Sequence, residues 1–370
     1  MTAPVFLDLS QLVHDPARTG IQRAERELIR HWPAPAPLVP CRLDPARGDF
    51  RLLPESLLAI LTEDVPPGGV EGEKRLIAPY LRAGPPLPAG ANLLCAELFT
   101  DPARAAAYRA LANGVQASWL VYDFLPWLYP DWFGPGGARS LMPYLRALRA
   151  VPRAAFISAQ TRAEYARVMR REAAGPVVPL GGDGFGLERQ VFSPARRGFV
   201  FLGTLEPRKN AAAVLRAFER LWEGETDARL TVIGRPAPDA PAEQKLIERL
   251  ADEPRLRVLG RAPDSAVRTA LRGARALLFP SEGEGFGIPP MEALHAGIPA
   301  VIAASLPAAQ GLPALGQIRL DPVTDGTVLS AVRRLLDDAE AERLWAEAAA
   351  LRVPTWRDFA EAVAGWAQAA

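Results

Sequence analysis

Two glutamates, Glu284 and Glu292, stand eight positions apart in a glycine-rich segment. Three glycines surround the first glutamate, and two consecutive prolines precede the second. Glycine lets backbone N–H groups approach a ligand closely, proline suits the first turn of a helix, and a helix N-terminus favours phosphate. Because carboxylates also accept hydrogen bonds from sugar hydroxyls, the segment predicts a site for a phosphorylated sugar. A plain helix start, with Glu292 against the helix dipole in the first turn, is the alternative for either glutamate alone.

A second cluster, Gly203–Asn210, carries two adjacent cations, Arg208 and Lys209. The chain has only two other lysines, Lys74 and Lys245. The cluster follows an apolar run and precedes a helical pattern, which is where a doubly wound fold holds phosphates. A solvated turn with two exposed cations is the alternative interpretation.

The elements around these clusters alternate between short apolar runs and amphipathic helices. Strands that are apolar throughout predict a parallel sheet covered on both faces, and its ligands bind at the carboxyl ends of the strands. The predicted strands of this second half are Phe199–Gly203, Leu230–Gly234, Leu256–Gly260, Ala276–Phe279 and Ala300–Ala303.

The first half has the same α/β character with less regular spacing. Its predicted strands are Val5–Leu9, Asn92–Cys95, Trp119–Tyr122 and Ala155–Ile157. Residues 33–92 are rich in Pro and Gly and support few assignments. We expect a first domain over residues 1–195, a second over 196–354, and a closing helix over 355–370 that packs back on the first domain.

Composition narrows the class of protein. The chain has 370 residues, and 49% of them are apolar, which excludes a disordered chain. Its net charge is +1, so there is no bulk electrostatic attraction to nucleic acid. Two cysteines without metal-site spacing favour a reducing compartment. The N-terminus lacks the pattern of a signal peptide, and glycines and prolines break the uncharged stretch 293–318. These features predict a cytoplasmic protein.

The two clusters resemble the family 4 retaining glycosyltransferases, which have the GT-B fold of two Rossmann-like domains facing across a cleft. The motifs that carry the resemblance are "GTLEPRKN" and the Glu-x7-Glu pattern within "EGFGIPPMEALHAG". Further N-terminal stretches resemble bacterial enzymes that build mannose-, rhamnose- or fucose-containing surface polysaccharides. These stretches are "TGIQRAEREL", "YDFLPWLYPDWF", "SAQTRAEY" and "PLGGDGF".

The resemblance implies a role for each matching residue. It places Lys209 on the donor diphosphate with Arg208 beside it, Glu284 on hydroxyls of the transferred sugar, and Glu292 on the ribose. Gly20 would lie in an N-terminal loop that closes on the donor. Residues of the two turns would meet the phosphates through their backbone: Gly203, Thr204, Gly285, Phe286, Gly287 and Ile288. Thr204 stands where many family members carry arginine, so Lys209 must neutralise the diphosphate with help from Arg208 or another arginine.

The implied reaction moves a hexose or deoxyhexose of the mannose, rhamnose or fucose type from a GDP- or TDP-linked donor to a glycan or a lipid-linked glycan. Lys209, Arg208 and helix-terminal N–H groups can stabilise the departing diphosphate without a metal. The chain contains no Asp-x-Asp sequence, so it lacks the metal–diphosphate motif of the other large glycosyltransferase fold. The resemblance further implies retention of the anomeric configuration, for which front-face attack is the preferred hypothesis.

Three features of the first half have two interpretations each. Asp123, just after a predicted strand, either binds an acceptor hydroxyl or caps a turn. The aromatic run Tyr122–Phe133 either stacks on sugar or a lipid carrier, or forms core under a loop, which we favour. The arginine-rich stretch 139–172 is either a solvated face or a contact for anionic lipid head groups on the inner face of the membrane.

Two other functions fit the same scaffold. A sugar-nucleotide epimerase would need general acids and bases facing the donor sugar, and the chain has only three histidines. A non-catalytic protein that binds sugar nucleotides or glycans would be expected to lose the phosphate-binding cations, and Lys209 is present. We therefore expect a glycosyltransferase.

Overall fold

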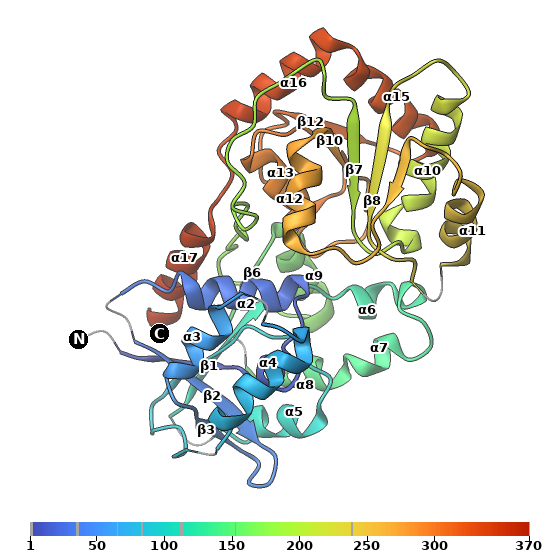
Figure 1. Ribbon diagram of the computed structural model, residues 1–370. Helices are drawn as coiled ribbons and strands as arrows, with labels where there is room; N and C mark the ends of the chain where they lie inside the picture. Colours follow the sequence, from blue (N-terminus) through green and yellow to red (C-terminus); the bar gives the residue numbers. More distant parts are fainter. Residues whose placement is uncertain are drawn as a thin grey trace. The chain divides into compact units, whose positions relative to one another are not determined.

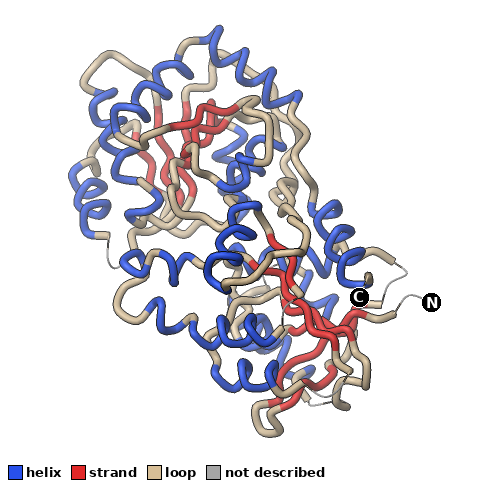
Figure 2. The backbone as a smooth tube through the Cα atoms, turned by 180° about the vertical axis from the view of Figure 1, so that it is seen from behind, coloured by secondary structure: helices blue, strands red, loops and turns tan. Residues whose placement is uncertain are grey.

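The chain folds into two α/β units in the computed structural model, which describes residues 3–34, 37–64, 66–82, 84–111, 114–151, 153–237 and 240–369. The first unit comprises Met1–Leu180 together with Trp356–Ala370, and the second comprises Gly181–Thr355. Each unit contains one six-stranded sheet. Figure 2 shows the strands of each sheet as a layer with helices beside it.

The first unit is built on a sheet with the strand order β3-β2-β1-β4-β5-β6, parallel except for the edge strand β3. Its strands are β1 (Val5–Asp8), β2 (Leu38–Asp44), β3 (Asp49–Leu52), β4 (Asn92–Cys95), β5 (Gln116–Val121) and β6 (Ala154–Phe156). Its helices up to β4 are α1 (Ser10–His14), α2 (Gly20–Arg30), α3 (Ser56–Thr62), α4 (Gly69–Ile77) and η1 (Ala78–Tyr80). Those after β4 are α5 (Pro102–Arg109), α6 (Leu125–Leu128), η2 (Pro130–Trp132), α7 (Gly137–Ser140), α8 (Met142–Ala150) and α9 (Ala159–Met169).

The second unit is built on a fully parallel sheet with the order β12-β11-β10-β7-β8-β9. Its strands are β7 (Gly198–Leu202), β8 (Arg229–Ile233), β9 (Leu256–Val258), β10 (Ala274–Phe279), β11 (Ala300–Ala303) and β12 (Gln317–Leu320). Its helices are η3 (Pro207–Lys209), α10 (Ala211–Trp222), α11 (Pro241–Arg249), α12 (Asp264–Arg272), α13 (Ile288–His295), α14 (Pro307–Gln310), α15 (Asp325–Leu336) and α16 (Asp338–Ala350). The alternation of strands and helices expected for this half is confirmed.

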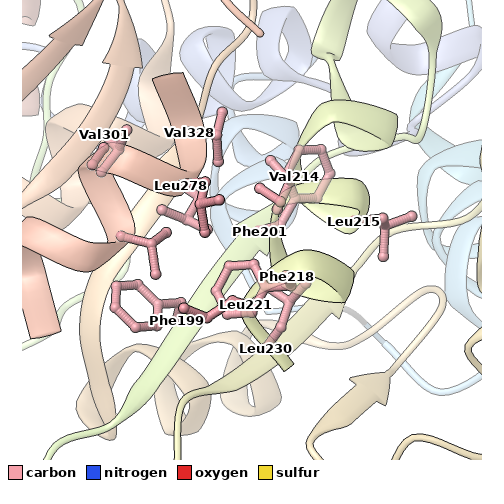
Figure 3. Close-up of a cluster of buried hydrophobic side chains, with 14 of the residues drawn as sticks. Phe199, Phe201, Val214, Leu215, Phe218, Leu221, Leu230, Leu278, Val301 and Val328 are labelled. Carbon is pink, nitrogen blue, oxygen red and sulfur yellow. The ribbon is translucent and has the colours of Figure 1, made fainter. Parts of the chain in front are cut away.

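The core of the second unit follows from the two-residue period of its strands. Phe199 and Phe201 point to one face of β7, where they meet α10 through Phe218 and α15 through Val328. Figure 3 shows these side chains interleaved with those of the neighbouring strands. Because this face is fully covered, β7 is held rigidly and the turn that follows it starts from a fixed point.

The last helix, α17 (Trp356–Gln368), belongs to the first unit, where it packs against α2 and β4. The side chain of Asn92 donates a hydrogen bond to the carbonyl of Ala367, and the Arg153 guanidinium lies 4.8 Å from the ring centroid of Trp366. Trp356 is buried, so the apolar face of this helix is covered.

The division between the units falls earlier than residue 195. Residues 181–195 pack on the second unit: Gln190 N–H donates to the carbonyl of Ala296, and the ring of Phe192 contacts that of Trp345. This segment has no helix or strand of its own, so its sequence pattern gave no sign of which unit it joins. Among the residues described, no helix is both long and apolar enough to cross a membrane.

Candidate functional site

Two turns of the second unit meet at the carboxyl ends of neighbouring strands. Lys209 ends η3, which follows β7, and Glu284 lies in the turn after β10. Because β7 and β10 are adjacent and parallel, both turns leave the same edge of the sheet. Lys209 Nζ donates a hydrogen bond to Oε1 of Glu284 across this edge. The predicted convergence of the cation cluster and the first glutamate therefore occurs in the structure.

The two turns are fastened together by further hydrogen bonds. The backbone N–H of Glu282 donates to the carbonyl of Arg208 at 3.0 Å. Asn210 Nδ2 donates to the carbonyl of Pro280 at 3.0 Å and to Oε2 of Glu282 at 2.8 Å. Asn210 has a φ of +56°, a left-handed conformation that asparagine tolerates better than most residues. The cation cluster and the glutamate turn thus form one structural unit.

Glu284 is the centre of a small charged group. Its Oε1 also accepts a hydrogen bond at 2.7 Å from Ser281 Oγ, and Arg208 Nη1 lies 3.6 Å away. The side chains of Lys209 and Glu284 are 13% and 15% exposed, so this pair is only partly screened by water. A lysine ammonium has three donors, so Lys209 can hold Glu284 and an incoming anion at the same time. Sequence reasoning missed Ser281, because a serine in a turn has no distinctive pattern.

Arg208 is fixed by neighbours rather than by solvent. Its Nε donates to Oε2 of Glu206 at 2.8 Å, and its Nη1 donates to the carbonyl of Gly283. The guanidinium therefore spans the same two turns as Lys209. Arg208 and Lys209 supply two cations beside one carboxylate, an arrangement that can bind an anion.

Glycine is required where the strand ends approach each other. Gly203 and Gly234 follow β7 and β8 with φ of +150° each, and a Cβ on Gly234 would lie 1.8 Å from the carbonyl oxygen of Gly203. The N–H of Leu205 donates to the carbonyl of Arg235 at 2.9 Å, which holds the two turns side by side. Thr204 is exposed in this turn. Arg235, also exposed, brings a further cation to this edge of the sheet, which sequence reasoning did not identify.

The glycine-rich turn leads directly into α13. Gly287 precedes the helix with a φ of +107°, and a Cβ there would lie 2.6 Å from Leu306 Cδ1. The backbone from Gly285 to Ile288 therefore approaches the helix start in a conformation that a larger residue would disturb. Glu292 is buried at 2% exposure. Glu292 is the fifth residue of α13, so the expectation that it lies in the first turn of the helix was wrong. Stabilisation by the helix dipole therefore does not explain a glutamate at this position.

The candidate residues of the first unit lie on two elements. Gly20 is the exposed first residue of α2, and the preceding Thr19 forms a capping box with Gln22. Asp123 follows β5 and accepts a hydrogen bond from the N–H of Leu125 at 3.1 Å. Asp123 therefore has a capping contact, and its part in acceptor binding remains a prediction.

Part of the aromatic run after β5 is exposed rather than buried. Trp127, Tyr129 and Phe133 are 40%, 39% and 36% exposed, and Tyr129 stacks on Trp132 with ring centroids 4.3 Å apart. The favoured interpretation of this run as core was wrong for these three residues. They lie in or directly after the short helices α6 and η2, whereas the aromatic residues at the start of the run, Tyr122 and Phe124, are buried.

The first unit also contains a buried ionic network that the sequence did not reveal. Arg104 of α5 donates to Oδ2 of Asp8 at 2.9 Å through Nε and also pairs with Glu97. Tyr108 donates to the same Asp8 oxygen at 2.6 Å, and Glu97 accepts two backbone N–H groups at the start of α1. Burial raises the pKa of Glu97, although the Arg104 charge opposes this shift. The network fixes α1 at the carboxyl ends of β1 and β4.

Glu25 of α2 is buried beside this network. It is 0% exposed, and neither carboxylate oxygen has a hydrogen-bond partner among the described residues. Burial, with the negative charge of Glu97, raises the pKa of Glu25 well above its ordinary value. Among the described residues, these carboxylates included, no group of three or more His, Cys, Asp or Glu side chains is placed to hold a metal ion.

Comparison with protein families supports the expected class. Residues 188–352 match the family described as "Glycosyl transferases group 1", so this part of the chain is a glycosyltransferase group 1 domain. The match covers Lys209, Glu284 and Glu292.

Individual relatives agree with this assignment. The chain is 27% identical over 334 residues to the serotype-specific mannosyltransferase WbdA of Escherichia coli, covering 81% of this chain and 39% of that protein. It is 36% identical over 115 residues to the O-antigen chain mannosyltransferase B of E. coli, covering 30% of each. The crystal structure of Anabaena HepE in complex with UDP has a TM-score of 0.64 at 16% identity and covers 98% of both chains. The two-domain GT-B fold is therefore confirmed, and the chain spans well under half the length of WbdA.

Proposed function

Since residues 188–352 form a glycosyltransferase group 1 domain, we propose that the chain transfers a sugar of the mannose, rhamnose or fucose type from a nucleoside-diphosphate donor to a glycan or lipid-linked glycan. The observation that carries the proposal is the contact between Lys209 and Glu284 at the carboxyl edge of a parallel sheet. Two relatives are named mannosyltransferases, which favours a mannose-type sugar and a GDP-linked donor. A structural neighbour binds UDP, which supports the nucleotide part of the donor.

The donor diphosphate binds at the two cations. Lys209 and Arg208 meet its oxygens, and the backbone N–H groups of the turn from Gly285 through Phe286 and Gly287 to Ile288 complete the cradle. Gly203 and Thr204 line its other side. Arg235, on the turn beside Thr204, is the arginine that can replace the one other family members carry at that position.

Glu284 and Glu292 hold the sugar and the nucleoside. Glu284 accepts hydrogen bonds from hydroxyls of the transferred sugar while Ser281 and Lys209 keep its carboxylate oriented. Glu292, buried in α13, accepts hydrogen bonds from the ribose. In this proposal Gly20 of the first unit lies in the loop that closes on the donor, and Asp123 binds an acceptor hydroxyl.

The chemical step separates charge onto the diphosphate. The anomeric C–O bond breaks with its electron pair going to the β-phosphate oxygen, and the acceptor hydroxyl oxygen forms the new bond on the same face. The acceptor proton passes to that phosphate oxygen. Lys209 and Arg208 stabilise the developing negative charge, so the reaction needs no metal. Attack on the same face retains the anomeric configuration.

The acceptor side of the first unit offers a surface for a lipid-linked substrate. Trp127, Tyr129 and Phe133 are exposed next to the segment that carries arginines in α7, α8 and α9. Exposed aromatic rings stack on sugars or enter the interface of a membrane, and arginines contact anionic head groups. The exposed arginines here are Arg139, Arg146, Arg149, Arg162, Arg167 and Arg170. This combination supports a peripheral membrane contact.

The direct test is a panel of GDP-mannose, TDP-rhamnose, GDP-fucose and UDP-glucose, measured by calorimetry with the purified chain. We expect one class of donor to bind and to give a glycosylated product only when an acceptor glycan is added. An isomerised nucleotide sugar without acceptor would identify an epimerase instead. Donor binding without any transfer to a range of acceptors would identify a non-catalytic binding protein.

A further inference from the structure

A cavity of about 560 Å³ lies in the second unit against β7, β8 and β9, on the face opposite to the side chains of Phe201 and Leu230. Helix α12 forms its opposite wall. In the view of Figure 1, α12 lies to the left of β7 and β8, and α10 lies to their right. The cavity contacts the first three residues of β7 and, on β8, Arg229 and Thr231. The two donor turns, residues 203–210 and 281–288, instead follow the carboxyl ends of β7 and β10. The cavity is therefore separate from the candidate donor site.

Small residues leave this space open. Val200 of β7 pairs with Thr231 of β8, and Gly198 pairs with Arg229, so no side chain rises from β7 opposite the arginine. On α12, Val267 and Leu271 are buried, while Ala266 and Ala270 face the cavity. A helix that presents alanines to a sheet does not fill the gap between them. The volume is within the roughly 300–1,000 Å³ range of pockets that bind small molecules.

Two exposed arginines, Arg229 and Arg257, line this space. Thr231 pairs with Arg257 of β9, and Arg229 lies two residues before Thr231, so both guanidiniums are on the same face at diagonal positions. In the part of the chain that the structure describes, no hydrogen bond or ion pair engages either guanidinium.

The third arginine of the cavity differs from these two. Arg197 Nε lies 3.5 Å from Oδ2 of Asp227, and its Nη1 lies 3.4 Å from Oδ1 of Asp338. Asp227 is the carboxylate that lines the cavity, and it faces Arg197. No carboxylate in the described part of the chain forms an ion pair with Arg229 or Arg257.

We propose that this cavity binds a phosphate-bearing small molecule, with its phosphoryl group held between Arg229 and Arg257. A phosphoryl group has enough oxygens to accept hydrogen bonds from two guanidinium forks at once, whereas one fork already satisfies a carboxylate. The hydroxyls of Thr231 and Ser265 line the same cavity and add donors. The remaining lining of Val200, Leu259 and alanines accommodates a compact sugar or nucleoside body. The site does not depend on the proposed transferase activity.

The test uses inorganic pyrophosphate as the probe with the full-length chain. Three proteins are compared: the wild type, Arg229→Gln with Arg257→Gln, and the control Arg333→Gln with Arg352→Gln. The control arginines are exposed, and they lie outside both the cavity and the donor turns. Calorimetry gives the affinity, and hydrogen–deuterium exchange separates the cavity from the donor turns, because the edge strand β9 and the surface helix α12 exchange measurably.

We expect pyrophosphate to slow exchange over residues 255–272 in the wild type and the control, and not in the cavity variant. Loss of charged hydrogen bonds should weaken cavity binding by about tenfold to a hundredfold. Arg257→Gln alone provides a milder variant if the double substitution lowers the melting temperature. Protection confined to residues 203–210 and 281–288 in the wild type would overturn the proposal. Protection of residues 255–272 that persists in the cavity variant would also overturn it.

Discussion

Lys209 and Glu284, separated by 75 positions in the sequence, share a hydrogen bond at one edge of a parallel sheet. The lysine follows β7 and the glutamate follows β10, which are neighbours although β8 and β9 lie between them in the chain. The crossover of the doubly wound topology therefore brings a cation and a carboxylate together. Their contact orients both groups before any ligand binds, which reduces the entropy cost of forming the site.

Glu292 should distinguish ribose from deoxyribose. We predict that the wild type binds UDP or GDP more tightly than the 2′-deoxy analogue, and that Glu292→Gln reduces this preference by about tenfold, since hydrogen bonds to a charged group contribute about 1.5–3 kcal/mol. Calorimetry with both nucleotides measures the ratio. Glu342→Gln, an exposed glutamate of α16, is the control. An unchanged ratio in Glu292→Gln would remove this residue from the ribose site.

The transfer reaction should continue without divalent ions. In the proposed donor site, Lys209 and Arg208 supply the positive charge that a metal would otherwise provide at the diphosphate. We predict that the rate in excess EDTA equals the rate in added Mg²⁺ or Mn²⁺, measured by release of the nucleoside diphosphate. Loss of transfer on chelation, restored by either ion, would contradict this assignment of the cations.

Glu25 should make stability depend on pH. Its folded pKa is raised well above the ordinary value of 4.5, so its contribution to the free energy of unfolding is fully present below that value. The contribution is lost progressively as pH rises toward the folded pKa. We predict that Glu25→Gln becomes more stable relative to the wild type as pH rises from 4.5. The difference should grow by about 1.4 kcal/mol per pH unit while the folded protein keeps the carboxyl protonated and the unfolded chain ionises it.

Urea denaturation at several pH values above 4.5 measures the difference. The groups whose charges act on Glu25 are Glu97, Arg104, Asp8 and Arg26. Glu342→Gln again serves as the control, since that side chain is exposed. A stability difference between Glu25→Gln and the wild type that stays constant across the range would show that Glu25 is not held neutral by burial.

Arg104 should be essential to the first unit. Its removal leaves Asp8 and Glu97 as buried carboxylates without their cation. We predict that Arg104→Leu lowers the free energy of unfolding by about 3–5 kcal/mol. Thermal and urea denaturation of this variant and of Arg109→Leu, an exposed arginine of the same helix, provide the measurement and its control. Equal stability of the two variants would contradict a stabilising role for the network.

The sequence predicted the part of the site in which charged side chains directly follow an apolar strand pattern. Apolar runs that only buried parallel strands explain precede Arg208, Lys209 and Glu284. The sequence therefore predicted that these residues lie at the carboxyl edge of the sheet. The Asp8–Arg104 contact joins residues 96 positions apart, and no local pattern reveals it.

Two other expectations failed because they depended on tertiary context. Exposure of Trp127 and Tyr129 depends on whether another layer covers them, which composition does not determine. The expectation that Glu292 lies in the first turn of its helix was wrong because α13 begins at Ile288, before the pair of prolines.

The central claim is that Lys209 neutralises the diphosphate of a sugar nucleotide, and Lys209→Ala tests it most directly. The matched control is Lys245→Ala, because Lys245 is an exposed lysine of α11 outside the site. The measurement is the calorimetric affinity for the donor nucleotide sugar, together with the rate of sugar transfer and the melting temperature. We predict that Lys209→Ala weakens donor affinity by about tenfold to a hundredfold at an unchanged melting temperature, while Lys245→Ala behaves as the wild type. Wild-type donor affinity and transfer in Lys209→Ala would contradict the account.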